Sequence, residues 1–378
     1  MYSAPQKTHE NTMIILAIES SCDDTSVCIL RPPAKAGDFP QIVALNGLNQ
    51  DLVLAKWGGV IPEIAARNHL AKLAPLLEQC LQESQLSVKQ VDQIAVTTHP
   101  GLLGPLLTGL NAAKALALLF ERPINPVNHL YAHLEAVHLT ENVAYPYLGL
   151  LASGGHCLYM LVTSSRDFKI LGRTVDDAAG EAFDKGGKLL GLGYPAGAKI
   201  DQLAKQGKPT IKFPIGLKDS GDAMLSFSGV KTALRLYLEQ HGLPAGEALA
   251  NLCCSYQEAI TDALVLKLKK ALQPYPKLPI VVGGGVASNS NLRQKVANFG
   301  RAYDHPTYFV APRYCTDNSA MIANYAYRTP ENAVAYPACL ALEAAGRFIP
   351  KGVGPENNAP TSQANQPNQP NQANHHGK

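Results

Sequence analysis

The sequence predicts an α/β protein built from two related halves. Residues 13–30 read as an apolar strand, a polar turn and a second strand, and residues 147–164 repeat that order as a second β-hairpin. Each half then carries a strand, a glycine-containing turn and a helix, over 93–118 and over 279–299. This repeated order indicates a duplication in which each half opens on a hairpin.

The composition of the 378-residue chain is that of a globular protein, with 46% hydrophobic and 17% charged residues. We predict a first half over 13–143 and a second half over 144–345, and leave open whether the last helices pack back on the first half. Residues 1–12 are predicted to be a flexible start. Residues 351–378, rich in Asn, Gln and Pro, are predicted to be a disordered tail.

Residue usage disfavours several classes of protein. Residues 1–12 lack the apolar segment of a secretory leader, and no apolar run approaches the roughly 20 residues of a membrane span, so we expect no membrane segment. The eight cysteines form no C-x-x-C pair, which suits reduced thiols in a cytoplasm. A net charge of +3 neither indicates nor excludes a nucleic-acid partner.

Small residues fill the turns of both halves. The hairpin turns read "ESSCDDTS" and "ASGGHC", and glycines follow the later strand of each half. Backbone N–H groups in such turns, and at the helix N-termini behind them, can bind phosphate. Actin, the sugar kinases and the heat-shock ATPases are each built from two duplicated halves that hold a nucleotide between them. We therefore predict the duplicated actin-like fold, with the ligand in the cleft between the halves.

Three histidines lie close together in "VNHLYAHLEAVHL". Asn128 is a good N-cap, so we expect a helix from His129. His129 and His133 then share one face at i,i+4, the spacing at which two imidazoles can hold one metal ion. Two surface histidines are the alternative interpretation. His138 faces elsewhere and is interpreted as structural or solvent-facing.

Asp317 is the best distant candidate for a third ligand. It follows a predicted strand and opens the helix beginning in "CTDNSA", so capping of that helix is the alternative role. Two histidines and one carboxylate with open positions suit Fe(II), and zinc remains an alternative. We predict one Fe²⁺ per chain.

Nine segments occur in an order typical of one family, and together they span roughly residues 13–345. They resemble the bacterial type of the tRNA threonylcarbamoyladenosine transferase family, once named O-sialoglycoprotein endopeptidases. The segments are "ILAIESSCDDTS", "GGVIPEIAARNHL", "THPGLLGPLLTGLNAAKALA", "NHLYAH", "LLASGGH", "DDAAGEAFDKGGKLLGLGYPAG", "SFSGVKTAL", "VVGGGVASNSNLR" and "CTDNSAMIA".

The resemblance implies an activity as well as the actin-like fold. The enzyme would transfer a threonylcarbamoyl group from threonylcarbamoyl-adenylate to the N6 amine of the adenosine 3′ of the anticodon, in tRNAs reading ANN codons, and release AMP. The implied partners are a bacterial paralogue of the same fold and a small P-loop ATPase, in the cytoplasm. The alternative is a non-catalytic scaffold of the same complex, which we would expect to lack the metal residues. A metallopeptidase is disfavoured because Leu130 stands where such enzymes place a catalytic Glu.

The resemblance also implies the residues of the site. The metal ligands would be His129, His133 and Asp317. The substrate-binding residues would be Leu151, Ala152, Ser153, Gly154, Gly155, Asp184, Gly197, Asp201 and Asn289.

Several of these residues have alternative roles. Asp184 and Asp201 are expected to accept hydrogen bonds from ribose hydroxyls, but Asp184 could instead pair with a nearby lysine and Asp201 could be a surface carboxylate. Asn289 could cap a helix. Asp23 and Asp24, in the first hairpin turn, are candidates to accept the amine proton, although turns also favour Asp for local reasons.

Overall fold

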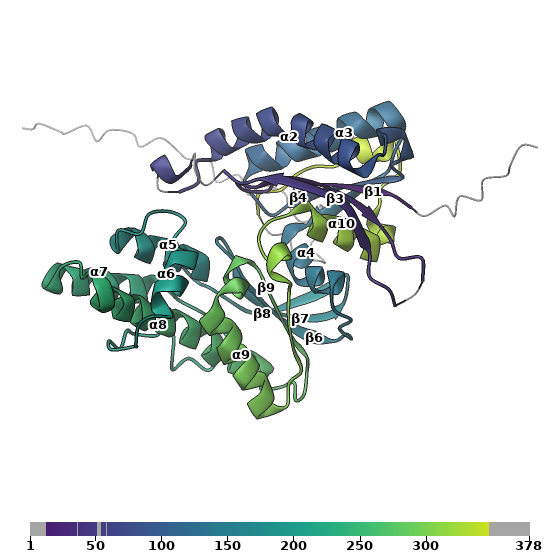
Figure 1. Ribbon diagram of the computed structural model, residues 1–378. Helices are drawn as coiled ribbons and strands as arrows, with labels where there is room; N and C mark the ends of the chain where they lie inside the picture. Colours follow the sequence, from purple (N-terminus) through teal and green to yellow (C-terminus); the bar gives the residue numbers. More distant parts are fainter. Residues whose placement is uncertain (1–12, 36, 51–53, 58, 348–378) are drawn as a thin grey trace, which may run out of the picture. The chain divides into compact units, whose positions relative to one another are not determined.

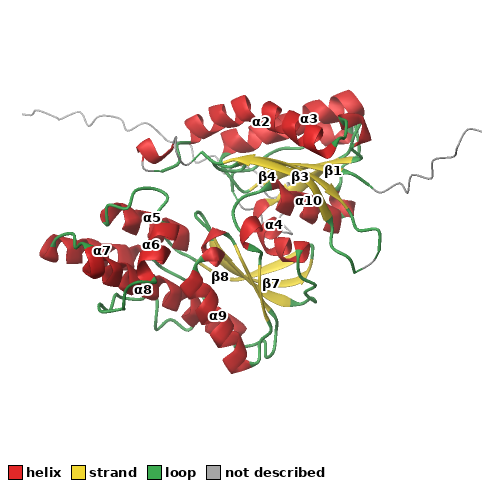
Figure 2. Ribbon diagram, in the orientation of Figure 1, coloured by secondary structure: helices red, strands yellow, loops and turns green. Residues whose placement is uncertain are grey.

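The computed structural model describes residues 13–35, 37–50, 54–57 and 59–347 (Figure 1). The expectations for residues 1–12 and 351–378 lie outside the described residues. The described chain contains two five-stranded sheets, and helices cover them (Figure 2). The strands of the first sheet fall within 13–143 and those of the second within 144–345, but the division into halves at 143 stays a prediction.

The first sheet has the strand order β3-β2-β1-β4-β5. Strand β1 pairs antiparallel with β2, which confirms the first predicted hairpin, and parallel with β4. All five residues of β1 are buried, as expected for an apolar strand in the middle of a sheet covered on both faces. The strands are β1 (Ile15–Glu19), β2 (Thr25–Arg31), β3 (Gln41–Leu48), β4 (Gln93–His99) and β5 (Ile124–Asn128).

The second sheet repeats the first strand by strand. Its order is β10-β9-β6-β7-β8, so β6 pairs antiparallel with β7 and parallel with β9, just as β1 pairs with β2 and β4. This confirms the second predicted hairpin and the predicted duplication. The strands are β6 (Tyr147–Ala152), β7 (Cys157–Ser164), β8 (Asp167–Arg173), β9 (Ile280–Gly283) and β10 (Thr307–Phe309).

Helices α2 and α3 contact the first sheet on one face, and α10 contacts β1 and β2 on the other (Figure 1). Helices α5 to α8 follow β8 in the sequence, and α9 follows β9. The α-helices are α2 (Pro62–Ser84), α3 (Leu103–Phe120), α4 (His129–Glu135), α5 (Ala179–Leu189), α6 (Gly197–Ala204), α7 (Ser228–His241), α8 (Gly246–Leu272), α9 (Ser290–Tyr303) and α10 (Ser319–Arg328). The short 3-10 helices are η1 (Ala55–Trp57), η2 (Val88–Gln90), η3 (Ala136–Leu139), η4 (Gly285–Ser288), η5 (Pro312–Tyr314), η6 (Pro330–Asn332) and η7 (Ala338–Ala341).

Helix α3 corrects one expectation from the sequence. By length and composition it is apolar enough to cross a membrane, although no such run was expected. In the structure it contacts β4 and α2 and buries one stripe against them, including Leu106, Leu110 and Ala113. An apolar helix that packs on a sheet can have the same length and composition as a helix that spans a membrane.

Two helices, α4 and α10, link the first sheet to later parts of the chain. Helix α4 contacts strands of both sheets, namely β4 and β5 of the first and β6 and β9 of the second. Helix α10 contacts α4 as well as β1 and β2, although it follows the second sheet in sequence. Its first residue, Ser319, donates its backbone N–H to Ser26 Oγ over 3.1 Å, across 293 positions of sequence. The open question about the last helices is thus answered for α10, which packs on the first sheet.

Candidate metal centre

Helix α4 begins at His129 because Asn128 caps it. Asn128 has an extended backbone, and its side-chain oxygen accepts the N–H groups of Leu130 (2.9 Å) and Tyr131 (3.2 Å). This confirms the predicted helix start. All seven residues of α4 are buried, so its histidines are held away from bulk water in a fixed orientation.

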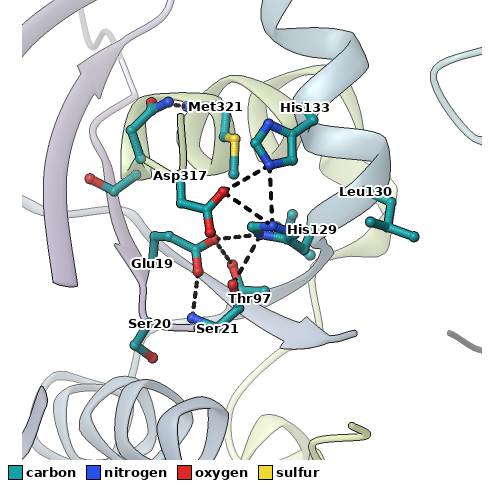
Figure 3. A network of polar contacts seen from close by, with 12 residues as sticks. Glu19, Ser20, Ser21, Thr97, His129, Leu130, His133, Asp317 and Met321 are labelled. Atoms are coloured by element: carbon teal, nitrogen blue, oxygen red, sulfur yellow. Dashed lines mark hydrogen bonds and ion pairs between the residues drawn. The ribbon is translucent and has the colours of Figure 1, made fainter. Parts of the chain in front are cut away.

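The side chains of His129, His133 and Asp317 converge (Figure 3). His133 Nε2 lies 3.0 Å from Asp317 Oδ1, His129 Nε2 lies 3.5 Å from the same oxygen, and the two Nε2 atoms are 3.2 Å apart. Metal bonds of about 2.0–2.1 Å at tetrahedral angles place donor atoms about 3.3 Å apart. The spacing and chemistry of these three donor atoms therefore fit one small divalent ion, and their role as its ligands stays a prediction.

Asp317 does not cap helix α10. The cap is Asn318, whose side-chain oxygen accepts the N–H of Met321 over 3.0 Å, so the alternative role for Asp317 was wrong. The Asp317 side chain is 21% exposed, which leaves one side of the carboxylate open beside two buried imidazoles. A ligand could approach the cluster from this side.

Glu19, which was not among the residues predicted from the sequence, binds His129 through Nδ1, the ring nitrogen that does not face the cluster. Glu19 is completely buried at the end of β1, and its Oε2 lies 3.1 Å from His129 Nδ1. It also accepts hydrogen bonds from Thr97 Oγ1 and from the backbone N–H of Ser21, each over 2.6 Å. A carboxylate can only accept, so Nδ1 of His129 carries the shared proton and Nε2 presents its lone pair to the cluster. The one available signal was a carboxylate that ends an otherwise apolar strand.

The electrostatics of the cluster favour a positive charge. Burial opposes ionisation of His129, but the carboxylates of Asp317 and Glu19 raise the pKa of His129 well above its ordinary value. Burial likewise opposes ionisation of Asp317, yet His129 and His133 hold the pKa of the Asp317 carboxyl well below its ordinary value. Burial lowers the pKa of His133. The two carboxylates beside the imidazole pair therefore favour positive charge at this point, whether that of a proton or of a metal cation.

A second buried carboxylate fixes the other end of α4. Glu135 accepts hydrogen bonds from Tyr145 (2.6 Å), Tyr147 (2.7 Å) and Arg328 Nε (2.7 Å). Asn324 of α10 donates to the Glu135 backbone oxygen over 2.8 Å. Because Arg328 and Asn324 belong to α10, these contacts hold the helix that carries the histidines against the helix that follows Asp317.

His138 belongs to this second network and not to the cluster. It is buried, and its ring centroid lies 5.6 Å from that of Tyr145 and 6.3 Å from that of Tyr147. Its Nε2 atom is 3.8 Å from Glu135 Oε1. The structural interpretation of His138 is therefore confirmed, and the solvent-facing alternative was wrong.

The turn between β6 and β7 carries the segment expected to bind substrate. Leu151 and Ala152 end β6 and are buried, and they anchor the turn in the second sheet. The turn is closed by Ser153, whose N–H donates to the His156 carbonyl over 2.8 Å, and by the His156 N–H, which donates to Ser153 Oγ over 3.1 Å.

Gly154 and Gly155 form the exposed tip of this turn. A Cβ atom added to either would meet no heavy atom of the protein within 4 Å, so their backbone is open to a ligand. Gly180, in the first turn of α5, packs directly beneath and donates its N–H to the Ser153 carbonyl over 3.1 Å. The N-terminus of α5 therefore lies behind the glycine tip, an arrangement that favours an anion there.

The glycine turn lies within electrostatic range of the cluster. Burial lowers the pKa of His156 to about 4, and His129 and His133 lower it further as neighbouring positive groups.

Asp184 and Gly197 lie at the junction of α5 and α6. Asp184 Oδ1 accepts the backbone N–H of Ala196 over 2.8 Å, and Gly197 is the first residue of α6. The Asp184 carboxylate therefore fixes the loop that leads into α6. Its predicted contact with ribose remains a prediction.

Asp201 and Asn289 meet at the start of α9. Asp201 Oδ1 accepts the Ser290 hydroxyl over 2.7 Å, and its Oδ2 pairs with Lys205 over 3.0 Å. Asp201 is buried, so its interpretation as an ordinary surface carboxylate was wrong. Asn289 caps α9 by accepting the N–H of Leu292 over 3.0 Å, as its alternative role proposed, and its amide donates to Gln257. The cap does not exclude the predicted contact with the adenylate.

Asp23 and Asp24 lie in the turn between β1 and β2, and the structure places Asp24 near the cluster. Asn49 donates to Asp24 Oδ1 over 2.8 Å, and Asp24 lines the same cavity as Asp317. Their predicted role as proton acceptors remains a prediction.

Solved structures share this architecture at low sequence identity. HypF from T. kodakarensis is 15% identical with a TM-score of 0.53, over 85% of this chain and 48% of that one. Component A of the (R)-2-hydroxyglutaryl-CoA dehydratase of Acidaminococcus fermentans is 15% identical with a TM-score of 0.50, over 84% of this chain and 98% of that one. The two matching sheets and these similarities define a protein of the duplicated actin-like α/β class, as predicted.

Sequence similarity defines the family within that class. Residues 41–324 match the family described as tRNA N6-adenosine threonylcarbamoyltransferase. A protein of that name from Anaeromyxobacter sp. (strain Fw109-5) is 48% identical, over 82% of this chain and 92% of its own length. The chain therefore belongs to the tRNA N6-adenosine threonylcarbamoyltransferase family.

Proposed function

We propose that this chain transfers the threonylcarbamoyl group of threonylcarbamoyl-adenylate to the N6 amine of the adenosine 3′ of the anticodon, in tRNAs reading ANN codons, and releases AMP. The observation that carries the proposal is the convergence of His129, His133 and Asp317, in a chain that also carries an open glycine turn. A non-catalytic scaffold would have no need of three converging donors, so we prefer the enzyme.

His129, His133 and Asp317 would hold the metal, because their donor atoms have the spacing that a divalent ion requires. We propose Fe²⁺, to which two histidines and one carboxylate are suited, with zinc as the alternative. When bound, such an ion supplies Lewis-acid polarisation of a carbonyl or phosphate oxygen.

The residues of the chain itself bind and orient the donor. We propose that the backbone N–H groups at Gly154 and Gly155, where the turn is open, hold the phosphate and stabilise the charge of the departing adenylate. Asp184, Asp201 and Asn289 are proposed to contact the ribose and base. Each already holds a loop or a helix start, which fixes its orientation before the donor arrives.

The remaining proposals rest on the resemblance. We propose that the chain works in the cytoplasm with a bacterial paralogue of the same fold and a small P-loop ATPase. Reconstitution with and without each partner, read as product per enzyme over many turnovers, tests both assignments.

The decisive experiment combines tRNA transcript, threonylcarbamoyl-adenylate and the partner proteins, followed by nucleoside mass spectrometry. We expect threonylcarbamoyladenosine with the wild type and its near-loss with His129→Ala, His133→Ala or Asp317→Ala. His241→Ala, an exposed histidine at the end of α7, is the matched control and should retain activity. Full activity in all three cluster variants would refute a metal-centred site, and an inactive wild type beside a working relative would favour the scaffold.

A further inference from the structure

The segment "SFSGVKTAL" (226–234) opens helix α7, and the proposed function gives it no role. It is bound to the chain just before α5 through Asp176. The carboxylate of Asp176 accepts the Phe227 N–H over 2.7 Å and the Ser226 hydroxyl over 2.5 Å. The start of α7 is therefore fixed to the residues that lead into α5.

The next residue, Asp177, joins the two helices by ion pairs. Its Oδ1 accepts a hydrogen bond from Lys185 of α5 over 2.8 Å, and its Oδ2 pairs with Lys231 of α7. Burial opposes ionisation of Asp177, but the hydrogen bonds and charges of the two lysines hold the pKa of its carboxyl below the ordinary value. The side chains of Asp177 and Lys231 are only 14% and 22% exposed, so water screens their charges less than those of a surface pair.

Asp177 stands just before the helix end that lies behind the glycine turn. Gly180, three residues later, donates its N–H to the Ser153 carbonyl over 3.1 Å, and a Cβ added to Gly180 would lie 2.8 Å from Gly154 Cα. Consecutive Cα atoms are about 3.8 Å apart, so the Cα atoms of Asp177 and Gly180 are separated by no more than about 11 Å. An anion on the glycine tip would thus lie on the order of 10 Å from the Asp177 carboxylate, about one Debye length at moderate ionic strength.

Without a counter-charge, the carboxylate of Asp177 would oppose a phosphate on the glycine tip. The N-terminus of a helix favours an anion, but a carboxylate near the same helix end repels one. Glu181, in the first turn of α5, adds a second negative charge. Lys185 contacts both Glu181, over 2.6 Å, and Asp177, while Lys231 contacts Asp177 from outside the helix. Two lysines thus balance two carboxylates at this helix end.

We propose that Lys231 neutralises Asp177 and thereby allows the glycine turn to hold the phosphate of the donor. The proposal rests on the proposed function and deepens it, because it names a residue that sets donor affinity through Asp177. Lys185 cannot replace Lys231, because it also pairs with Glu181 and would leave one positive charge beside two negative ones. At an effective dielectric constant of about 20, two unit charges about 10 Å apart interact strongly enough to change a binding constant about tenfold.

A purely structural role for the ion pair is the rival interpretation. In that case the pair holds α7 against α5, and loss of either partner would displace the glycine turn. The two interpretations predict opposite effects when the charge of Asp177 is removed. A structural pair would lose phosphate binding, whereas removal of a repelling charge would preserve or strengthen it.

The test measures the binding of AMP and of adenosine to the full-length chain, supplied with Fe²⁺, by calorimetry. AMP is the product under the proposed function and carries the phosphate, which adenosine lacks. We expect Lys231→Met to weaken AMP binding about tenfold and to leave adenosine binding unchanged, while Lys231→Arg, which keeps the charge, binds AMP like the wild type. Lys277→Met is the control, because Lys277 pairs with Asp304 over 3.0 Å and precedes β9, at the end of the second sheet opposite to the glycine turn.

A double substitution separates the effect of charge from that of structure. Asp177→Asn keeps the shape of the side chain, and on its own it should bind AMP at least as tightly as the wild type. Added to Lys231→Met, it should restore AMP binding to within about twofold of the wild type. An increase in salt from about 50 to about 500 mM should also reduce the difference between the wild type and Lys231→Met, because salt screens the uncompensated carboxylate.

Any of three results would overturn the proposal. The first is AMP binding in Lys231→Met that equals that of the wild type. The second is an equal loss of AMP and adenosine binding in Lys231→Met, which would assign the lysine a structural role. The third is an Asp177→Asn variant that binds AMP as weakly as Lys231→Met or does not restore binding in the double variant. The proposed function fails separately, if the reconstituted wild type forms no threonylcarbamoyladenosine.

Discussion

The two hairpin turns occupy equivalent positions in the duplicated sheets but have opposite chemistry. The turn after β1 follows a buried carboxylate, Glu19, whose hydrogen bonds end on His129. The turn after β6 follows buried Ala152 and ends in two exposed glycines with an open backbone. Under the proposed function, the turn of the first half would support a histidine that holds the metal ion, and the turn of the second half would hold the phosphate with its N–H groups. Duplication supplies the two sheets, and the few residues at each hairpin turn determine which ligand that turn can bind.

The largest expected effect comes from removing the charge of Glu19, the residue that precedes the first turn. Glu19→Gln keeps the shape of the side chain but lets its amide point a donor at His129, so the imidazole loses its fixed tautomer. We expect metal affinity, measured by competition with a chelating dye, to fall by about 10–100-fold. Glu258→Gln, which removes a partner of Lys295 between α8 and α9, is the control. Equal affinities in the two variants would show that Glu19 has no part in metal binding.

An intermediate effect is expected in the second turn. Gly154→Ala adds a methyl group that meets no atom of the protein, so the free energy of unfolding should change by no more than about 0.5 kcal/mol. The methyl group does occupy the open backbone, and we expect donor affinity to fall about tenfold, or about 1.4 kcal/mol. Calorimetry with a non-hydrolysable adenylate measures this loss.

Gly180→Ala is the matched contrast. Its new Cβ would lie 2.7 Å from the Ser153 carbonyl oxygen, so this variant should lose about 1–3 kcal/mol of stability in urea unfolding. If Gly154→Ala bound the donor normally, the glycine tip would not be the anion site.

The smallest effect concerns the pH dependence of stability. In the folded protein the pKa of His156 is lowered to about 4, chiefly by burial, while an unfolded histidine titrates near 6.5. The unfolded state therefore binds a proton that the native state does not, and this histidine makes stability fall as pH falls from about 6.5 towards 4. In His156→Gln the loss of stability between pH 7 and pH 5.5, measured by urea unfolding, should be smaller by about 1 kcal/mol. If the variant lost as much stability as the wild type between these pH values, the pKa of His156 would not be lowered in the native state.

Local patterns in the sequence predicted much of this frame. The two hairpins and the strand–turn–helix units appear where apolar runs and small residues alternate, because these elements are determined by neighbours in sequence. The start of α4 was predictable for the same reason, since Asn128 caps it through contacts two and three residues away. Placing Asp317 with the histidines required the resemblance as well as the pattern, since 184 positions separate it from His133.

Long-range contacts account for what the sequence did not predict. Glu19 meets His129 across 110 positions, and no local pattern indicates which partner a buried carboxylate finds. Asp201 reads as a surface residue in its own helix, but α9 arrives 89 positions later and buries it. For His138, helical spacing predicted the direction away from the other two histidines, but it did not predict the contacts with Tyr145 and Tyr147.

The return of α10 to the first sheet has a consequence for biosynthesis. His133 emerges from the ribosome 184 residues ahead of Asp317, and at about 5–20 residues per second that interval lasts about 10–40 s. During this time β1 and β2 lack the helix that covers them in the finished protein. A nascent chain therefore holds two histidines without their carboxylate, and it can complete the three-donor cluster only in the last tenth or so of the described sequence.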